Sequence, residues 1–461
     1  MIVTDNLILN SDSYKYSQYD QYPPGTTHVY SYIESRGGLY DKCVYNGLQP
    51  FLHYLRDHSI TEEMIDEAEA IITAHGLPFY RDGWQHIVDN HKGELPVFIC
   101  GIPEGTILAP KNVLVSIVNT DPACWWLPSF LETALLRAIW YPTTVASNNY
   151  RSKEIILAAL ERTGDPALID FKLHDFGARG VSSLESAAIG GTAHLINFMG
   201  TDTVEALAHV MRYYGATGPV GFSIPAMEHS TVTSWGRDGE EASFRNMLNK
   251  HAKPGGLVAC VSDSYDIYEA CKLWGTKLKD DVIKSGATVV VRPDSGEPSE
   301  VVSKCAWILD SYFGHTVNDK GFRVLNNVRI IQGDGIDHAS IRSILYVLTM
   351  NGYSADNIAF GQGGALLQQV NRDTMKFAMK CSAAKINGEW IDVFKDPITD
   401  QGKQSKKGML ALIKPEDGPY LTIRQSELRD GDINLLTERF IEGNLVDETT
   451  FEEVRDRAKK G

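Results

Sequence analysis

Paired cysteines, long apolar runs and an excess of positive charge are all missing from this sequence. Its seven cysteines are odd in number and no two have CxxC spacing, so a zinc cluster and a disulfide framework are both disfavoured and reduced thiols are expected. No apolar run is long enough to span a bilayer, and the first 20 residues lack the basic and apolar regions of a signal peptide. These absences predict a cytoplasmic protein with no membrane partner.

Positive charge is scarce as well. The chain has 44 Lys and Arg against 59 Asp and Glu, a net charge of -15, which disfavours binding to nucleic acid. There is no GxxxxGK[ST] loop, and GQGGALL has Leu366 where GxGxxG needs its third glycine. The sequence therefore supports neither a Walker-type NTPase nor a Rossmann dinucleotide site.

The 461 residues, 43% of them hydrophobic, are enough for two or three domains with a large core. Residues 1–135 and 372–461 mix strand-like and helix-like patterns, and we expect them to form one mixed α+β domain. Within the first segment, the alternation of Val113, Val115 and Ile117 predicts a half-exposed strand.

The pattern changes between residues 136 and 371. Here short apolar runs end in Gly, Asp, Ser or Arg before helix-like segments; they are FKLHDFGARG, LINFMGTDT, VGFSIPAMEH, GLVACVSDSYD, ATVVVRPDSG, RIIQGDGID and NIAFGQGG. Apolar strands that alternate with helices are typical of parallel βαβ units. The predicted fold class is α/β, with an α/β-barrel-like catalytic domain at 136–371 beside the mixed α+β domain.

In a barrel of this kind, the active site is built from the loops that follow the strands. The residues at those positions are His174, Arg179, Asp202, His229, Asp263, Asp266, Arg292, Asp294, Asp334, Gly363 and Gly364. The loops RPDSG, QGDG and FGQGG combine arginine, carboxylates and glycine N–H groups, the mixture that suits a phosphate with Mg²⁺. Taken alone, His229 is compatible with a core residue, a metal ligand, a proton shuttle or a nucleophile.

Long segments of the chain resemble the nicotinamide phosphoribosyltransferases of the type II phosphoribosyltransferase family. In chain order they are SDSYKYSQYDQYPPGTTHVYSYIESR, KLHDFGARGVSS, NFMGTDTV, FSIPAMEHSTVTSWG, VSDSYDIY, VVRPDSG, IQGDGID, AFGQGG and VFKDP…SKKG. The resemblance implies a homodimer with active sites shared between subunits. It also implies transfer of phosphoribosyl from phosphoribosyl pyrophosphate to nicotinamide in NAD salvage, with Mg²⁺ as cofactor and ATP as energy-coupling co-substrate.

The resemblance implies roles for particular residues. His229 is the histidine that ATP would phosphorylate, and Asp266 is the carboxylate expected to orient its ring, with Glu228 beside it. Phe176 would stack on the pyridine ring together with Tyr14 of the partner subunit.

The same resemblance implies that Asp202 accepts the amide N–H of nicotinamide, where a carboxylate would repel nicotinate. It assigns Asp294 to a substrate hydroxyl or a metal, without a defined set of metal ligands. The other implied substrate contacts are Arg179, Ser223, Ser262, Arg292, Gly333, Asp334, Gly363 and Gly364, with Arg36, Arg372, Lys380 and Lys395 of the partner subunit.

Two alternatives remain beside this interpretation. A nicotinate phosphoribosyltransferase has related chemistry, and Asp202 argues against it. A non-catalytic signalling protein that keeps the fold is the other, and the set His229, Asp266, Arg292 and Asp294 argues against that.

Overall fold

The computed structural model describes residues 5–399 and 404–461, and the chain forms two compact units. Unit 1 comprises Met1–Ser147, His209–Thr217 and Val370–Gly461, and unit 2 comprises Asn148–Ala208 and Gly218–Gln369. Each unit has its own principal sheet and hydrophobic core. Among the described residues, no helix is both long and apolar enough to cross a bilayer. All seven cysteines are free, which confirms the prediction of unpaired thiols.

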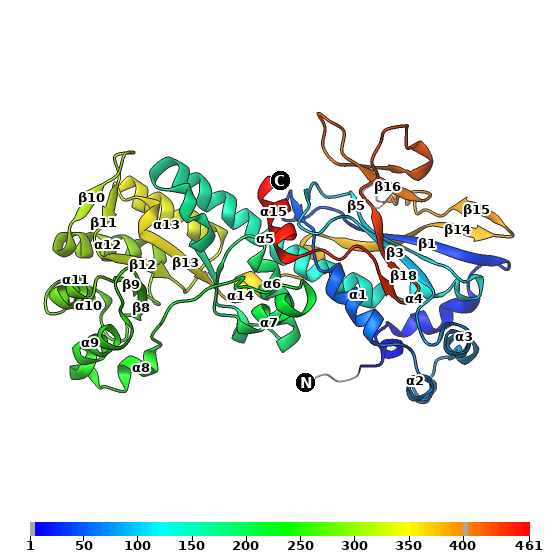
Figure 1. The fold of residues 1–461 in the computed structure, drawn as a ribbon, viewed down its shortest axis with the longest axis horizontal. Coiled ribbons are helices and arrows are strands. Elements are labelled where there is room, and N and C mark those ends of the chain that lie inside the picture. Colours follow the sequence, from blue (N-terminus) through cyan, green and yellow to red (C-terminus); the bar gives the residue numbers. More distant parts are fainter. Residues whose placement is uncertain (1–4, 400–403) are drawn as a thin grey trace. The chain divides into compact units, whose positions relative to one another are not determined.

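Unit 1 is built on an antiparallel sheet that joins both ends of the chain (Figure 1). The strand order is β15-β14-β1-β5-β3-β18-β19. The strands are β1 (Thr26–Ser35), β3 (Val97–Gly101), β5 (Val113–Asn119), β14 (Phe377–Ile386), β15 (Glu389–Asp392), β18 (Thr437–Ile441) and β19 (Asn444–Leu445). β1, β3 and β5 come from the first segment of the chain and the others from the last, so both ends of the chain share one sheet.

Helices and two short strand pairs complete unit 1. They are η1 (Leu7–Leu9), η2 (Ser13–Asp20), α1 (Leu48–Asp57), α2 (Glu62–Ala74), α3 (Arg81–His91), η3 (Pro122–Cys124), α4 (Leu127–Phe130), α15 (Phe451–Lys460), β2 (Cys43–Val44) with β4 (Ile107–Leu108), and β16 (Leu410–Ile413) with β17 (Leu421–Arg424). Helix α5 (Glu132–Thr163) begins in unit 1 and ends in unit 2.

The prediction that β5 is half exposed is wrong. Leu114 and Ser116, which lie between the predicted core positions, are only 1% and 4% exposed. β5 is paired on both sides, with β1 and β3, and both α4 and β16 pack against it. Successive side chains of a strand point to opposite faces of the sheet, and both faces are covered at β5. The alternating side chains of β5 are therefore buried on both faces.

Unit 2 contains a sheet in which all neighbouring strands are parallel. Its order is β7-β6-β13-β12-β9-β8. The strands are β6 (Leu173–Asp175), β7 (Gly200–Thr201), β8 (Leu257–Val261), β9 (Thr288–Arg292), β12 (Val328–Gln332) and β13 (Ile358–Gln362). They coincide with six of the predicted apolar runs, and the helices between them confirm the α/β-barrel-like class.

The helices of unit 2 follow these strands along the chain (Figure 1). They are α6 (Leu184–Leu195), α7 (Val204–Tyr213), α8 (His229–Thr233), α9 (Glu240–His251), α10 (Ile267–Gly275), α11 (Lys279–Ser285), α12 (Pro298–Phe313), α13 (His338–Met350) and α14 (Gly364–Leu367), with a hairpin of β10 (His315–Val317) and β11 (Arg323–Leu325). Only the first part of α7 belongs to unit 2, because the residues from His209 onwards lie in unit 1.

The seventh apolar run, VGFSIPAMEH, is an extended segment that pairs with both edges of this sheet. Phe222 forms a parallel bridge with Gly200 of β7, and Ala226 forms one with Ala259 of β8. Pro225 lies between the two bridges; it has no N–H to donate, but its carbonyl accepts from the Ala259 N–H at 2.9 Å. The segment therefore closes the sheet on itself without becoming a regular strand.

Lys172 fastens the start of β6 to the turn before β13. Its buried Nζ donates to the backbone carbonyls of Ala355, Asp356 and Ile358 at 3.2, 3.0 and 2.9 Å. Burial lowers the pKa of Lys172 to about 7, since desolvation disfavours the ammonium ion. These three bonds hold in place two of the strands that end at the site described below.

We expect Lys172→Met to lower the free energy of unfolding by about 1–3 kcal/mol, because it leaves buried carbonyls without a donor. Urea denaturation measures this difference. Lys284→Met, at an exposed position of α11, is the matched control and is expected to change stability by less than about 0.5 kcal/mol. Equal stability of the two variants would show that the Lys172 bonds contribute nothing net.

Candidate active site

His229 and Asp263 form the hydrogen bond at the centre of the site. His229 is the first residue of α8, and its Nε2 lies 2.9 Å from Oδ1 of Asp263, which follows β8 by two residues. The side chain of His229 is 45% exposed and that of Asp263 only 5%. The buried carboxylate therefore holds Nε2. With the ring proton on Nε2, the other ring nitrogen, Nδ1, carries a lone pair.

The expected partner of His229 was Asp266, and here the structure differs. Asp266 is the N-cap of α10, where its Oδ1 accepts from the N–H groups of Tyr268 and Glu269 at 2.9 and 3.1 Å. Capping satisfies N–H groups that the first turn of a helix leaves free. The spacing of Asp266 and Glu269 matches the capping signature of a helix start, and this signal was available in the sequence.

Asp263 also connects to the loop after β9. Its Oδ2 accepts from the backbone N–H of Asp294 at 3.0 Å and from the hydroxyl of Ser295 at 2.6 Å. Nη2 of Arg292, the last residue of β9, lies 3.6 Å from Oδ2 of Asp294. The buried Nε of Arg292 makes no hydrogen bond with any described residue, so this guanidinium has a donor available for an anion.

The ring of Phe176 lies over two glycines at the ends of neighbouring strands. A Cβ at Gly361 would lie 2.9 Å from Cζ of Phe176 and closer still to two other ring atoms. A Cβ at Gly333 would lie 3.3 Å from the same ring and 3.6 Å from Oδ1 of Asp294. Phe176 and Asp294 are therefore brought together across Gly333, inside the curve of the sheet.

Asp202 and Ser223 form the second polar pair. The hydroxyl of Ser223 donates to Oδ1 of Asp202 at 2.6 Å, and the Asp202 N–H donates to the carbonyl of Asp175 at 2.9 Å. Asp175 is fully buried, and desolvation raises the pKa of its carboxyl to about 6. Its Oδ1 accepts from Gly177 N–H at 2.7 Å, which fixes the turn that carries Phe176.

The remaining unit 2 candidates differ in position. Arg179, on η5 (Ala178–Gly180), and Asp334 are exposed, and Gly363 and Gly364 lie at the start of α14. A Cβ at Gly180 would lie 3.6 Å from the Gly364 N–H nitrogen, so the loops after β6 and β13 meet. These four residues share the carboxyl edge of the sheet with Phe176.

Ser262 is placed away from the loops. It is completely buried, and its hydroxyl donates to the Cys260 carbonyl and accepts from Nε1 of Trp274 at 2.9 and 3.1 Å. These bonds occupy the hydroxyl within the layer between the sheet and its helices.

Unit 1 gathers its own cluster of cations around Lys380. The pKa of Lys380 is lowered, first by burial and then by the positive charges of Arg36, Lys15 and Arg372, although Glu132 acts in the opposite direction. The buried Nη2 of Arg36 has no partner among the described residues. Lys15 was not among the predicted residues; its Nζ lies 2.5 Å from Oε2 of Glu132. This cluster is a local anion-attracting surface in a chain of net charge -15.

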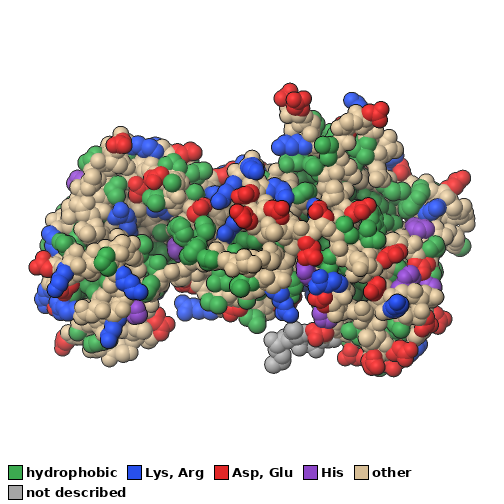
Figure 2. All heavy atoms as spheres, viewed as in Figure 1, with side chains coloured by type: hydrophobic (Ala, Val, Ile, Leu, Met, Phe, Trp, Pro, Cys, Tyr) green, Lys and Arg blue, Asp and Glu red, His purple; other side chains and the backbone are tan. Residues whose placement is uncertain are grey.

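Two further unit 1 candidates are on the surface. The Tyr14 ring is 56% exposed, with Nζ of Lys15 5.1 Å from its centroid. Lys395 is exposed and donates its N–H to the Ser405 hydroxyl at 2.8 Å. Figure 2 shows one group of acidic side chains at the end of unit 1 where α2 lies, and this helix carries Glu62, Glu63, Asp66, Glu67 and Glu69.

A curled parallel sheet with helices between its strands, and with a histidine, an arginine and carboxylates at the strand ends, is an α/β-barrel fold of the phosphoribosyltransferase class. The fold is similar to the crystal structure of nicotinate-nucleotide pyrophosphorylase from Pyrococcus furiosus, with a TM-score of 0.65 and 16% identity over 100% of this chain and 96% of that one. It is also similar to human nicotinic acid phosphoribosyltransferase, with a TM-score of 0.58 and 16% identity over 98% and 93%.

The chain belongs to the nicotinate phosphoribosyltransferase family of enzymes, which matches residues 171–449. Residues 6–99 match the N-terminal domain of nicotinamide phosphoribosyltransferase. The chain is 53% identical to the nicotinamide phosphoribosyltransferase of Xanthomonas campestris pv. campestris (strain 8004) over 98% of both chains. It is 32% identical to that of Acinetobacter baylyi, over 97% of this chain and 95% of the relative. The family resemblance of the motifs is confirmed.

We expect Gly361→Ala to displace the Phe176 ring and to destabilise the protein by about 1–3 kcal/mol through overpacking. Gly364→Ala is the control, because a Cβ there meets nothing within 4 Å. Urea denaturation measures both, and the double variant Gly361→Ala/Phe176→Leu is expected to recover part of the loss. A Gly361→Ala protein as stable as Gly364→Ala would contradict the close contact.

Proposed function

We propose that this protein is a nicotinamide phosphoribosyltransferase. It transfers the phosphoribosyl group of phosphoribosyl pyrophosphate to the ring nitrogen of nicotinamide, and nicotinamide mononucleotide and pyrophosphate leave. The observation that carries this proposal is the 53% identity, over 98% of both chains, to a relative of that name. The polar groups at the strand ends of unit 2 support it, because they suit a phosphorylated sugar and an amide.

Nicotinamide binds against Phe176. The ring of this residue offers a flat face beside Gly333 and Asp294, and offset stacking suits a pyridine, above all the pyridinium of the product. Tyr14 of the partner subunit supplies the second face in the proposed homodimer, for which its exposure in unit 1 leaves it available.

Asp202 selects the amide over the acid. Its carboxylate accepts from the Ser223 hydroxyl and has further lone pairs for the amide N–H of nicotinamide. The carboxylate of nicotinate at the same position would be repelled. The second candidate, a nicotinate phosphoribosyltransferase, is favoured by the family match over residues 171–449, and the Asp202 position argues against it.

The phosphoribosyl group and the pyrophosphate bind at the strand-end loops. Arg292, with its available Nε, and the glycines at 333, 363 and 364 contact phosphate and ribose oxygens, with Arg179 at the rim. In the homodimer, the cluster of Arg36, Arg372 and Lys380 of the partner subunit, with Lys395, adds positive charge for phosphates.

The carboxylates of Asp294 and Asp334 fit Mg²⁺, a hard cation that prefers oxygen ligands. When bound, the ion neutralises charge on the pyrophosphate as it leaves. The transfer breaks the bond from the anomeric carbon to the pyrophosphate oxygen and forms a bond from that carbon to the pyridine nitrogen. No general base is needed, since the pyridine nitrogen attacks as a neutral lone pair, and catalysis consists of positioning and electrostatics.

His229 couples the reaction to ATP as a phosphorylated histidine. The nitrogen that Asp263 does not hold attacks the γ-phosphorus, the bond to the ADP oxygen breaks, and ADP leaves. Asp263 keeps the proton on Nε2 and stabilises the positive charge that develops on the ring. The enzyme is proposed to act in the cytoplasm, where NAD salvage would use its product.

We expect the protein to convert nicotinamide in preference to nicotinate, as identified by mass spectrometry of the mononucleotide in the presence of Mg²⁺. Asp202→Asn removes the repulsion and weakens the amide contact, so the preference for nicotinamide is expected to fall by about tenfold or more. Asp319→Asn, at an exposed turn between β10 and β11, is the control and leaves the ratio unchanged. Preferential formation of nicotinate mononucleotide by the unaltered protein would instead support the second candidate.

We expect ATP to phosphorylate His229, and His229→Ala to lose both the label and the stimulation by ATP while keeping basal transfer. Asp263→Asn is expected to slow labelling by about a hundredfold, because the imidazole loses the carboxylate that orients it. Asp266→Asn retains a good capping residue and is expected to label normally. The reverse pattern, with Asp266→Asn slow and Asp263→Asn normal, would assign the orienting role to Asp266.

A further inference from the structure

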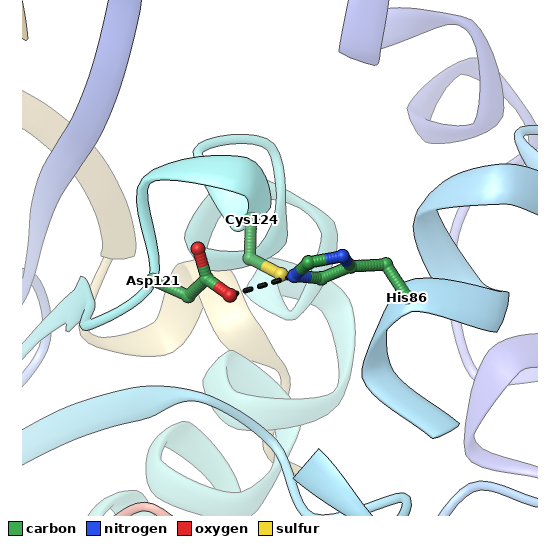
Figure 3. Close-up of side chains that lie close together, drawn as sticks. All are labelled: His86, Asp121 and Cys124. Carbon is green, nitrogen blue, oxygen red and sulfur yellow. Dashed lines mark hydrogen bonds and ion pairs between the residues drawn. The ribbon is translucent and has the colours of Figure 1, made fainter. Parts of the chain in front are cut away.

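Two histidines of α3 meet one carboxylate oxygen beside η3 in unit 1. Nε2 of His86 and Nε2 of His91 lie 2.7 and 2.8 Å from the same atom, Oδ2 of Asp121. One ring nitrogen of His86, a carboxylate oxygen of Asp121 and Sγ of Cys124 all lie within 4.8 Å of one another. Figure 3 shows these three side chains pointing toward one another from α3 and from the start and end of η3.

The carboxylate in this group is fixed by hydrogen bonds to both of its oxygens. Oδ1 of Asp121 accepts from the Ala123 N–H at 2.8 Å, which leaves Oδ2 for the two imidazoles. Nδ2 of the Asn90 side-chain amide donates to Nδ1 of His86 at 3.0 Å, so the ring proton of the neutral imidazole is on Nε2, which faces Asp121.

The thiol supplies the third donor. Cys124 is completely buried, and a cation bound to its sulfur takes the place of the thiol proton. An imidazole, a carboxylate and a thiolate together suit Zn²⁺, whereas Mg²⁺ and Ca²⁺ prefer oxygen alone. Ligands of a tetrahedral zinc ion lie roughly 3.3–3.8 Å apart, given bonds of about 2.0–2.3 Å. To reach this geometry the His86–Asp121 pair must open from 2.7 Å, while the Cys124 sulfur already lies within 4.8 Å of both ligand atoms.

We propose that His86, Asp121 and Cys124 form a Zn²⁺ site that fastens α3 to η3. Water completes the coordination, and His91 remains the hydrogen-bond donor to Asp121. On binding, the thiol proton of Cys124 passes to solvent and the His86 proton moves from Nε2 to Nδ1, where the Asn90 amide turns so that its oxygen accepts this proton. One proton is therefore released for each ion. The absence of CxxC spacing does not exclude this site, because only one of its three ligands is a cysteine.

The site lies next to contacts that hold η2, the segment that carries Tyr14. The ring of Tyr19 in η2 stacks on Tyr80, the N-cap of α3, with centroids 4.3 Å apart and planes 5° from parallel. Nε1 of Trp125, the residue after Cys124, donates to the Tyr19 carbonyl at 3.2 Å. A metal that joins α3 to η3 therefore holds together the two elements between which Tyr19 is packed.

The test uses the untagged full-length protein, stripped of metal with a chelator and then titrated with Zn²⁺ or Co²⁺. We expect about one ion per chain and, with Co²⁺, a near-ultraviolet thiolate-to-cobalt charge-transfer band that the added Zn²⁺ removes. Cys124→Ser is expected to lose the band, and His86→Gln to weaken binding by about tenfold or more. Circular dichroism establishes that each variant is folded.

Matched controls separate this site from adventitious binding. His251→Gln, at an exposed position in α9, and Cys381→Ser, at another free cysteine, are expected to bind like the unaltered protein. The proposal is overturned if the unaltered protein shows no thiolate-to-cobalt band, an outcome that does not depend on whether any variant folds. Retention of the band in Cys124→Ser, or of full affinity in His86→Gln, would overturn it equally.

Discussion

The parallel pairing of the unit 2 strands is the constraint on which the site depends. Parallel strands that share one sheet place all their carboxyl ends on the same side of the sheet. The segment around Pro225 pairs with both outer strands, β7 and β8, and so joins the two lateral edges of the sheet. The site residues come from different strands: Phe176 follows β6, Arg292 ends β9 and Gly361 lies near the end of β13. The glycines matter because they lack a side chain: the Phe176 ring occupies the space that a Cβ at Gly361 would fill.

In unit 1, strand pairing brings positively charged side chains together even though the chain as a whole is negatively charged. The pairing of β1 with β14 brings Tyr32 opposite Lys380, close to Arg36 at the end of β1. Burial lowers the pKa of Lys380, and the positive charges of Arg36, Lys15 and Arg372 lower it further, while acidic residues are exposed along α2. A chain of net charge -15 can thus still group cations locally, and screening in water limits the reach of the distant negative charges.

The strands of unit 2 were predictable from the sequence, whereas the burial of β5 was not. Apolar runs that end in polar residues identified six of the strands, since a parallel strand buried on both faces has no polar alternation. The motif SDSYD offers both Asp263 and Asp266 as partners of His229, and within the sequence only the capping signature of Asp266 and Glu269 distinguishes them. Asp266 caps α10 and Asp263 faces the histidine. The alternation in β5 misled because α4 and β16 pack against a strand already paired on both sides.

The sequence by itself determined the order of strands and helices, the family and the loops that carry the polar residues, because these depend on local patterns of a few residues. Only the tertiary structure decided that the VGFSIPAMEH segment closes the sheet, that Asp263 holds His229, and that His86 and His91 converge on Asp121. Each of these joins residues about thirty or more positions apart or distant strands of one sheet. Contacts at that separation are set by how strands and helices pack, and packing is a property of the whole fold that no local pattern encodes.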